Sequence, residues 1–252
     1  MSSNIWSCSQ PTANRDDLLA EVYFKYRPLT IGLQECAPEI RAEKTSLLDL
    51  CAPDYIELNP APKDINNFTP ILYSRRLRVE ESGWILFDGL NNLNSKSITW
   101  GLFAREDKRF IHINVHYYYE TNEKGEQARR QNSAQLLEVI EKLQRFQSPV
   151  IVTGDFNCTE RSEPLQTLLQ NGLTLSSAIN PQKVCSYHVF PQYDEEKNFF
   201  FGGSPLHPTY TAEDSLDHIF LKKAACTRFV TVQDQEALDA SDHCPIYADI
   251  KI

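Results

Sequence analysis

Eight polar residues stand at the ends of short apolar segments, and their types suit shared chemistry. The central segment, residues 150–157 (VIVTGDFN), is a run of β-branched residues that stops at a glycine and leads into an aspartate and an asparagine. Strand ends are where α/β enzymes place polar, reactive groups. Similar segments are SSNIW, IGLQEC, INVHYY, SLDHIF and SDHCPI. We expect them to form one site from Asn4, Glu35, His116, Asp155, Asn157, Asp217, Asp242 and His243.

The carboxylates and amides among these residues predict a metal site. Glu35 and Asp155 follow separate predicted strands, with the amides of Asn4 and Asn157 expected nearby. Such a hard, oxygen-rich set suits Mg²⁺ or Mn²⁺, which bind through one or two carboxylates together with substrate phosphate. The predicted cofactor is therefore Mg²⁺ or Mn²⁺.

The histidines are poor main ligands for Mg²⁺, but they suit a second task. His116 and His243 are able to donate hydrogen bonds to phosphate oxygens whose charge grows in the transition state. Asp217 beside His243 would hold its tautomer and raise its pKa, keeping it a donor. Together with the predicted metal, these residue types indicate a site that hydrolyses phosphoesters.

Several of the segments, in this order over nearly the whole chain, resemble the endonuclease/exonuclease/phosphatase superfamily, also called deoxyribonuclease I-like. The motifs that carry the resemblance are LQE, GDFN, the Asp-His-Ile-Phe strand and SDH. The resemblance implies an α/β fold: a four-layer α/β/β/α sandwich of two mixed, mainly antiparallel sheets flanked by helices. One domain over residues 1–252 is expected. Residues 83–101 most resemble a bacterial branch of hydrolases without an assigned substrate.

The same resemblance implies a role for each site residue. Glu35 would be the principal metal ligand, Asn4 a ligand or a supporting residue, and Asp242 a member of the metal shell. Asp155 would orient or deprotonate the attacking water, and Asn157 would bind phosphate or help to fix the metal. His243 would be the histidine that contacts the phosphate, and Asp217 would orient it. His116 would lie beside the phosphate. The N-terminus departs slightly from the family pattern, since only three residues precede Asn4 and the first strand is short.

Composition and charge bound the possible partners. The 252 residues carry a net charge of −9, and no apolar run is long enough to span a membrane. The N-terminal stretch has no export signal, so a cytoplasmic protein is expected. Nucleic acid is possible as a substrate but is not favoured by acidic charge, because duplex binding calls for a basic surface. Two basic clusters are expected to be solvated strand ends: Arg75, Arg76 and Arg78, and Arg105, Lys108 and Arg109.

The seven cysteines include no CxxC pair, which favours reduced core residues over a disulfide or zinc framework. Cys36, Cys158 and Cys244 each follow a proposed site residue, and thiolate ligands or a redox switch would be the functional interpretation. Because neighbouring residues of a strand face opposite sides, we expect these thiols to point into the packing instead.

Hydrophobic periodicity predicts the elements that position the site. The chain opens as strand, helix, strand, helix, with Asn14 capping the first helix and Pro38 beginning the second, whose apolar stripe is Ile40, Leu47, Leu48 and Cys51. Strand-like runs fill residues 55–116, and helices are expected over 123–147 and 164–169. The runs SLDHIFL, TRFVTV and CPIYADIKI should close one sheet. Residues 185–210, including His188 and His207, are expected to be irregular and aromatic, either as a loop packed on itself or as a substrate rim.

Three functions remain open. A phosphodiesterase or phosphatase for a small or lipid-derived phosphoester is favoured by the acidic charge and the aromatic segment. A Mg-dependent nuclease would require a basic stripe that leads to the site. A catalytically silent binding module would keep the fold without turnover, and the complete set of site residues argues against it.

Overall fold

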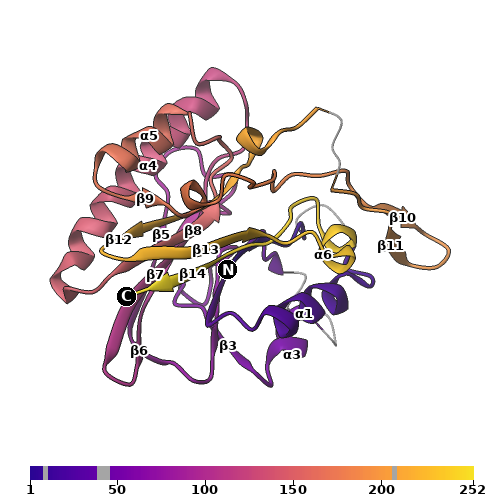
Figure 1. The fold of residues 1–252 in the computed structure, drawn as a ribbon, viewed down its shortest axis with the longest axis horizontal. Coiled ribbons are helices and arrows are strands. Elements are labelled where there is room, and N and C mark those ends of the chain that lie inside the picture. Colours follow the sequence, from indigo (N-terminus) through magenta and orange to yellow (C-terminus); the bar gives the residue numbers. More distant parts are fainter. Residues whose placement is uncertain (8–10, 39–45, 206–208) are drawn as a thin grey trace.

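Two six-stranded sheets pack face to face in the computed structural model, which describes residues 1–7, 11–38, 46–205 and 209–252 (Figure 1). The first sheet has the spatial order β13 (Ala225–Thr231), β14 (Ile246–Lys251), β1 (Ser2–Asn4), β2 (Thr30–Gln34), β4 (Ile71–Ser74), β3 (Tyr55–Leu58). The second sheet has the order β5 (Arg78–Leu86), β6 (Ser97–Arg105), β7 (Lys108–His116), β8 (Val150–Asp155), β12 (Asp217–Lys222), β9 (Thr174–Leu175). β1 pairs with β2 and β7 with β8 in parallel, and the other ladders are antiparallel.

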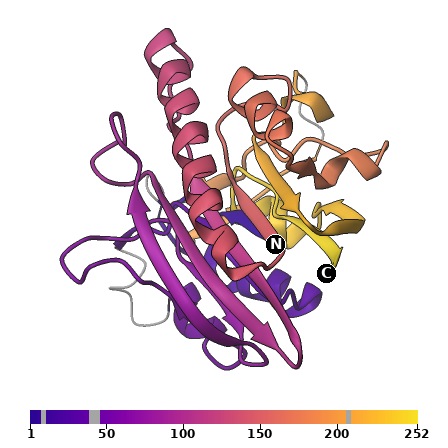
Figure 2. The same cartoon turned by 90° about the vertical axis from the view of Figure 1, so that its left-hand side faces the viewer.

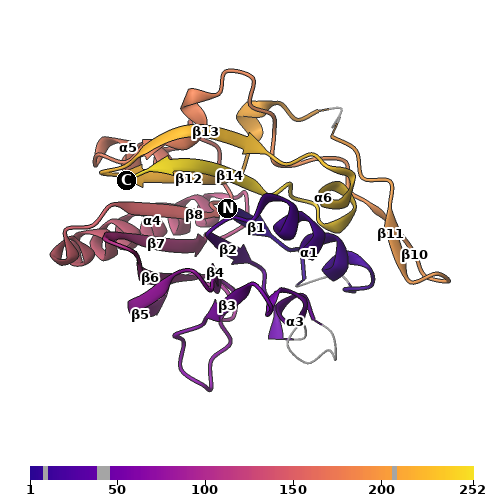
Figure 3. The ribbon, with the colours of Figure 1, turned by 60° about the horizontal axis from the view of Figure 1, so that its bottom comes forward.

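Helices cover the outer face of each sheet (Figures 2 and 3). The helices against the first sheet are α1 (Arg15–Tyr26), α3 (Leu47–Cys51) and α6 (Gln235–Ala240). Those against the second sheet are the long α4 (Glu123–Leu143) and α5 (Glu163–Gln170). The predicted four-layer sandwich with mixed, mainly antiparallel sheets is therefore confirmed.

Three apolar cores hold the layers together, and strand alternation explains how one strand serves two of them. In β8, Val150 and Val152 join the core under α4, whereas Ile151 joins the core between the sheets. Successive side chains of a strand point to opposite faces, so a strand buried on both sides is apolar throughout. The uninterrupted run VIV is what a central strand of such a sandwich requires.

Short elements complete the chain. They are the 3₁₀ turns η1 (Gln144–Phe146), η2 (Ser176–Ile179) and η3 (Ala212–Asp214), and the hairpin of β10 (Gln192–Asp194) and β11 (Phe199–Phe201). The hairpin extends from the body of the molecule at the right of Figure 1, within the stretch expected to be irregular. Among the described residues, no helix is both long enough and apolar enough to cross a bilayer.

Several sequence expectations need correction. The runs from residue 215 to the C-terminus do not close one sheet: β12 lies in the second sheet, and β13 and β14 lie in the first. Asn14 occupies the N-cap position of α1, but its side chain accepts from the Phe200 amide (2.7 Å) and donates to the Phe200 carbonyl (3.1 Å). The helix predicted to reach residue 147 ends at Leu143 and continues as η1.

The second predicted helix differs as well. Leu47, Leu48 and Cys51 lie in the separate helix α3, whose N-terminus is capped by a reciprocal pair of bonds between Ser46 and Asp49. Such a capping box satisfies backbone amides that would otherwise end the helix unpaired. Ile40, the first member of the expected stripe, lies outside the described residues.

Between the sheets, the apolar core gives way to a polar layer toward the end that carries the predicted site. Asn114 of β7 accepts from Gln34 of β2 (2.6 Å) and donates to the Leu33 carbonyl (2.6 Å). Thr153 of β8 also donates to Asn114 (3.0 Å). A Cβ at Gly32 would lie 2.3 Å from oxygens of both Asn114 and Thr153, so this close approach of the sheets requires glycine.

Candidate active site

Strand register brings three of the predicted residues into one row at the end of the second sheet. His116 at the end of β7 pairs with Asp155 at the end of β8, and Asp155 pairs with Asp217 at the start of β12. All three are buried, with at most 3% of each residue exposed. Residues that are far apart in the chain are thus aligned by the hydrogen-bond ladder, with Asp155 in the middle.

The first sheet adds an amide and a carboxylate to this row. The side-chain nitrogen of Asn4, at the end of β1, lies 3.0 Å from Oδ2 of Asp155 and 3.4 Å from Oε1 of Glu35. Glu35 follows β2 with a φ of 58°, in the left-handed region that non-glycine residues rarely occupy. That backbone strain ends the strand and turns the glutamate toward the site, and strain of this kind is common where chemistry is done.

His243 is held on the other side of Asp155. Its Nδ1 donates to Oδ2 of Asp217 at 2.7 Å, and the same oxygen accepts from the hydroxyl of Ser186 (2.7 Å). The hydroxyl of Ser241 accepts from the His243 amide (3.1 Å) and donates to the Asn4 carbonyl (2.8 Å). The loop before β14 is therefore tied to β1, which fixes the imidazole relative to both sheets.

A cleft of about 650 Å³ opens over these residues. Of the eight predicted residues, the following six line it: Glu35, His116, Asp155, Asn157, Asp242 and His243. Asn4 and Asp217 lie behind this lining and hold Asp155 and His243 through the bonds described above. The structure thus brings all eight predicted residues together, and Glu35 and His243 share one cleft.

Burial perturbs the ionisation of the acidic groups. Burial raises the pKa of Asp155 to about 6, with the nearby Asp217 adding to the rise and His243 opposing it. Burial likewise raises the pKa of Asp242 to about 7, and the charges of Glu35 and Asp155 act in the same direction. The cleft therefore concentrates negative charge that repels itself in the absence of a cation.

The two histidines differ in charge, because their pKa values are shifted in opposite directions. Burial alone would lower the pKa of His243, but the surrounding carboxylates, Asp217 foremost, raise it well above its usual value. Burial lowers the pKa of His116 well below its usual value, and the charges of Lys96 and His243 lower it further. His116 is therefore neutral, and its 3.4 Å contact with Asp155 is not an ion pair.

The donor set fits a hard divalent cation. Carboxylates and amide oxygens are the ligands that Mg²⁺ and Mn²⁺ prefer, and a positive ion would relieve the repulsion between Glu35, Asp155 and Asp242. Within the described part of the chain, no group of three or more His, Cys, Asp or Glu side chains is placed to hold a metal ion by itself. Mg²⁺ does not require such a group, because one or two carboxylates hold it while water and substrate phosphate complete its shell.

Lys96 is the cleft residue that sequence reasoning missed. Only 4% of the residue is exposed, and its Nζ lies 2.6 Å from Nε2 of His116 and 3.1 Å from Nδ1. A lysine just before a strand is ordinarily solvated, so its spacing carries no signal in the sequence. The hydroxyls of Ser186 and Ser241 escaped prediction for the same reason, because serines are common in loops.

The aromatic segment contributes one wall of the cleft. Tyr187 and Tyr210 line it, with their ring centroids 5.3 Å apart. Tyr187 also packs edge-on against the His243 ring, with centroids 4.9 Å apart. His188 is fully buried and its Nδ1 lies 2.8 Å from the Val189 carbonyl, whereas His207 lies outside the described residues.

The two basic clusters are solvated, and the three cysteines that follow site residues are packed in the interior, as predicted. All residues of both basic clusters are exposed and none lines the cleft: Arg75, Arg76, Arg78, Arg105, Lys108 and Arg109. Cys36, Cys158 and Cys244 are free thiols with at most 6% of each residue exposed. Burial raises the pKa of the Cys158 thiol to about 12, so this thiol is protonated and unreactive at neutral pH.

This fold, with carboxylates, amides and two differently charged imidazoles at one end of two packed sheets, defines a phosphoester hydrolase. The chain belongs to the Endonuclease/Exonuclease/phosphatase family, whose sequence model matches residues 1–243. Enzymes of this family generally use divalent metal ions. Among curated proteins, a search found no match.

Several solved structures share the fold across the full chain. A mannosyl-6-phosphatase of Bacteroides thetaiotaomicron is 20% identical with a TM-score of 0.75, covering 100% of this chain and 98% of that one. TDP2 of D. rerio, complexed with a single-strand DNA product, is 19% identical with a TM-score of 0.73, covering 100% and 97%. A protein of unknown function from Enterococcus faecalis is 19% identical with a TM-score of 0.73, covering 99% and 98%.

Proposed function

We propose that this chain is a phosphodiesterase or phosphatase for a small or lipid-derived phosphoester and that it uses Mg²⁺ or Mn²⁺. The proposal rests on one observation: groups of different chemistry surround Asp155 at one site. Asn4 and Glu35 approach it from the first sheet, and the His243–Asp217 pair lies one strand away. The result is a water-activating carboxylate beside groups that bind a phosphoryl oxygen.

Asp155 is suited to orient the attacking water and accept its proton. The amide of Asn157 donates to its Oδ1 (2.8 Å) and Asn4 donates to its Oδ2 (3.0 Å), which fixes the plane of the carboxylate. With a pKa raised to about 6, the group is ionised at neutral pH and still a competent base. Attack in line with the leaving oxygen needs no covalent enzyme intermediate.

His243 is suited to neutralise charge on the phosphoryl group. Its Nδ1–H is held by Asp217, which leaves Nε2–H to donate to a phosphoryl oxygen. Asn157 lines the same cleft and is anchored by a bond from its Nδ2 to the Tyr117 carbonyl (3.1 Å). A divalent ion held by Glu35, with Asn4 and Asp242 in support, would add positive charge beside the phosphoryl and leaving oxygens.

The nuclease alternative has weaker support. Of the described residues that line the cleft, Lys96 is the one lysine or arginine, and the two basic clusters lie at the opposite ends of their strands. A nucleic acid strand needs several phosphate contacts along its path. The net charge of −9 argues in the same direction, so small phosphoesters are favoured over DNA and RNA.

A substrate panel tests the proposal. Sugar phosphates, inositol phosphates, phospholipids, nucleotide sugars, oligonucleotides and bis-(p-nitrophenyl) phosphate would be assayed with Mg²⁺ and Mn²⁺, each with and without EDTA. We expect turnover that the chelator abolishes and that is confined to one class of small or lipid-derived phosphoester. Turnover confined to oligonucleotides would establish the nuclease, and no turnover with any substrate would support a silent binding module.

A further inference from the structure

The loop between β5 and β6 holds Lys96 at the wall of the cleft. The Lys96 amide donates to the Asn91 carbonyl (3.1 Å), and the Phe87 amide donates to the Lys96 carbonyl (3.1 Å). Residues 92–94 between them all adopt left-handed backbone angles, with φ of 48°, 54° and 69°. Asparagine adopts this conformation readily, whereas for Leu93 it costs about 1–2 kcal/mol. The turn before Lys96 therefore carries its backbone strain at Leu93.

The side chain of Lys96 is directed to the reacting region and away from solvent. Its Nζ contacts both ring nitrogens of His116, the nearer at 2.6 Å, and lies 5.8 Å from the centroid of the Tyr119 ring. His116 is neutral, so it accepts from the ammonium without cancelling its charge. Burial raises the pKa of Asp155, but the charge of Lys96 lowers it, so the ammonium acts electrostatically on the reacting region, where it can attract an anionic ligand.

The topology places this cation and the charged His243 on opposite sides of Asp155. In the strand order β6-β7-β8-β12, Lys96 lies just before β6, His116 and Asp155 end β7 and β8, and Asp217 begins β12. Asp217 in turn accepts a hydrogen bond from His243. A phosphoryl group whose phosphorus lies in front of Asp155 would have oxygens toward both flanks. In-line attack spreads negative charge over those equatorial oxygens.

We infer that Lys96 is a catalytic residue that donates a hydrogen bond to a non-bridging phosphoryl oxygen on the side of the cleft opposite His243. The inference rests on the proposed phosphoester hydrolysis and adds a second cationic contact to it. His116 positions the ammonium, and the face of the Tyr119 ring lies nearby, 5.8 Å from it. The ligand chemistry recognised is a phosphoryl group, whatever alcohol it is esterified to.

Two substitutions and a matched control test the inference. Lys96→Met removes the charge and keeps the length of the side chain, and Lys96→Arg keeps the charge. Lys124→Met makes the same chemical change at an exposed position of α4 outside the cleft lining. Each variant in the Mg²⁺-loaded state would be titrated with inorganic phosphate by calorimetry and assayed for kcat and KM on the best substrate of the panel.

We expect Lys96→Met to weaken phosphate binding about 10-fold or more and to lower kcat about 100-fold, the range for one lost charge-stabilising donor. Lys96→Arg should recover much of both, and Lys124→Met should match the parent protein. The melting temperature and the Mg²⁺ affinity should change little in Lys96→Met, whereas a lysine with only a structural role would lower them and spare phosphate affinity.

The outcomes separate this inference from the hydrolase proposal. Phosphate affinity and kcat of Lys96→Met within twofold of the parent would overturn the role of Lys96 while hydrolysis stands. Failure of the parent protein to bind phosphate would overturn it too. Phosphate binding that depends on Lys96, in a protein without turnover on any phosphoester, would support the phosphoryl contact and reject the proposed hydrolysis.

Discussion

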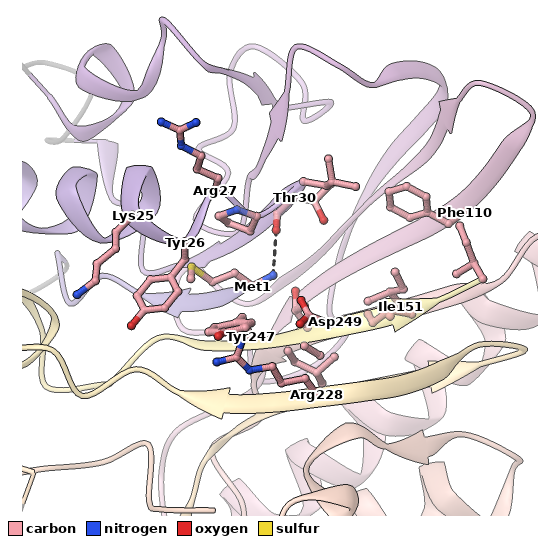
Figure 4. A pocket seen from close by; sticks show the side chains of 17 residues that line it. Met1, Lys25, Tyr26, Arg27, Thr30, Phe110, Ile151, Arg228, Tyr247 and Asp249 are labelled. Atoms are coloured by element: carbon pink, nitrogen blue, oxygen red, sulfur yellow. Dashed lines mark hydrogen bonds between the residues drawn. The ribbon is translucent and has the colours of Figure 1, made fainter.

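A second hollow lies between the sheets at the end opposite the cleft, and the two are similar in size, about 560 Å³ against about 650 Å³ (Figure 4). The opposite hollow has apolar walls that include Phe110, Ile151 and Ile219. Its charged side chains stand on an exposed rim, whereas the Met1 amine is buried in the hollow, donates to the Thr30 carbonyl (2.9 Å) and has its pKa lowered by burial to about 5.

The charged groups at the two ends of the sandwich differ in their burial. On the rim of the opposite hollow, Lys25 pairs with Asp234 at 2.9 Å, and the guanidinium of Arg228 lies 5.6 Å from the centroid of the Tyr247 ring. These groups remain in contact with water, so their charges are screened. In the cleft, Asp155 and Asp242 are more than 90% buried and their pKa values rise to about 6 and 7. Cavity size therefore does not distinguish the ends, whereas buried charge does.

The largest expected effect comes from replacing aspartate by asparagine at the cleft, and the same change at the opposite hollow is its control. Asp155→Asn removes the proposed base and should lower kcat/KM about 1,000-fold, roughly 4 kcal/mol in the barrier. Asp249→Asn makes the same change at the exposed rim of the opposite hollow and should leave kcat/KM within twofold. Steady-state kinetics on the same substrate measures both. Equal losses, or near-parental turnover by Asp155→Asn, would remove the distinction between the two ends.

The polar layer that separates the two hollows gives the next effect. Gly32→Ala would place a methyl group 2.3 Å from oxygens of Asn114 and Thr153, forcing the sheets apart. We expect a loss of about 3 kcal/mol in the free energy of unfolding, measured by urea denaturation. Gly172→Ala is the control: its φ of 84° carries strain, but no atom lies within 4 Å of the new methyl group, so about 1 kcal/mol should be lost. Similar losses in the two variants would show that the sheets do not depend on close approach here.

A smaller effect concerns acid stability. Burial lowers the pKa of His112 well below its usual 6.5, so the imidazole is neutral in the folded protein and charged in the acid-unfolded chain. The unfolded state then binds more protons below pH 6.5, and stability falls as pH falls, by up to about 1.4 kcal/mol per pH unit for one such group. His112→Gln should therefore flatten the dependence of unfolding free energy on pH between about 6.5 and 4.5.

The slope, and not the absolute stability, is the relevant readout for that variant. Asp155 and Asp242 have raised pKa values and contribute stability at low pH that is lost as pH rises through about 6 and 7, so they oppose the histidine term. Both are unchanged in His112→Gln, and subtracting the two pH curves isolates His112. An unchanged slope would show that the imidazole is protonated in the folded state.

The smallest expected effect concerns an exposed ion pair on the rim of the opposite hollow. Lys25→Met removes a rim cation whose side chain is 58% exposed, together with its contact to Asp234. Because exposed ion pairs contribute little, we expect no resolvable change in melting temperature or in kcat/KM. Calorimetry and the standard assay measure both, and a tenfold loss of activity would show that the opposite hollow communicates with the cleft.

Much of the fold was predictable from local pattern. Strand and helix periodicity located most elements, and the β-branched run before Asp155 predicted a buried strand, as β8 proves to be. The partition of the last three strands was not predictable, because β12 and β14 have similar apolar character. Their sheets are chosen by distant partners, β8 for β12 and β1 for β14. Likewise, the side chain of Asn14 bonds to Phe200, a partner 186 residues away in place of the local cap.

The sequence by itself determined which residue types stand at the strand ends, and so the eight polar residues of the cleft and the oxygen-rich chemistry they suit. The tertiary structure alone decided that Lys96 joins them, that His116 is neutral while His243 is charged, and that carboxylates are buried at one end of the sandwich and exposed at the other. The physical reason is that residue type and alternation are local properties of the chain. Burial and the nearest charge depend on strands brought together from distant positions.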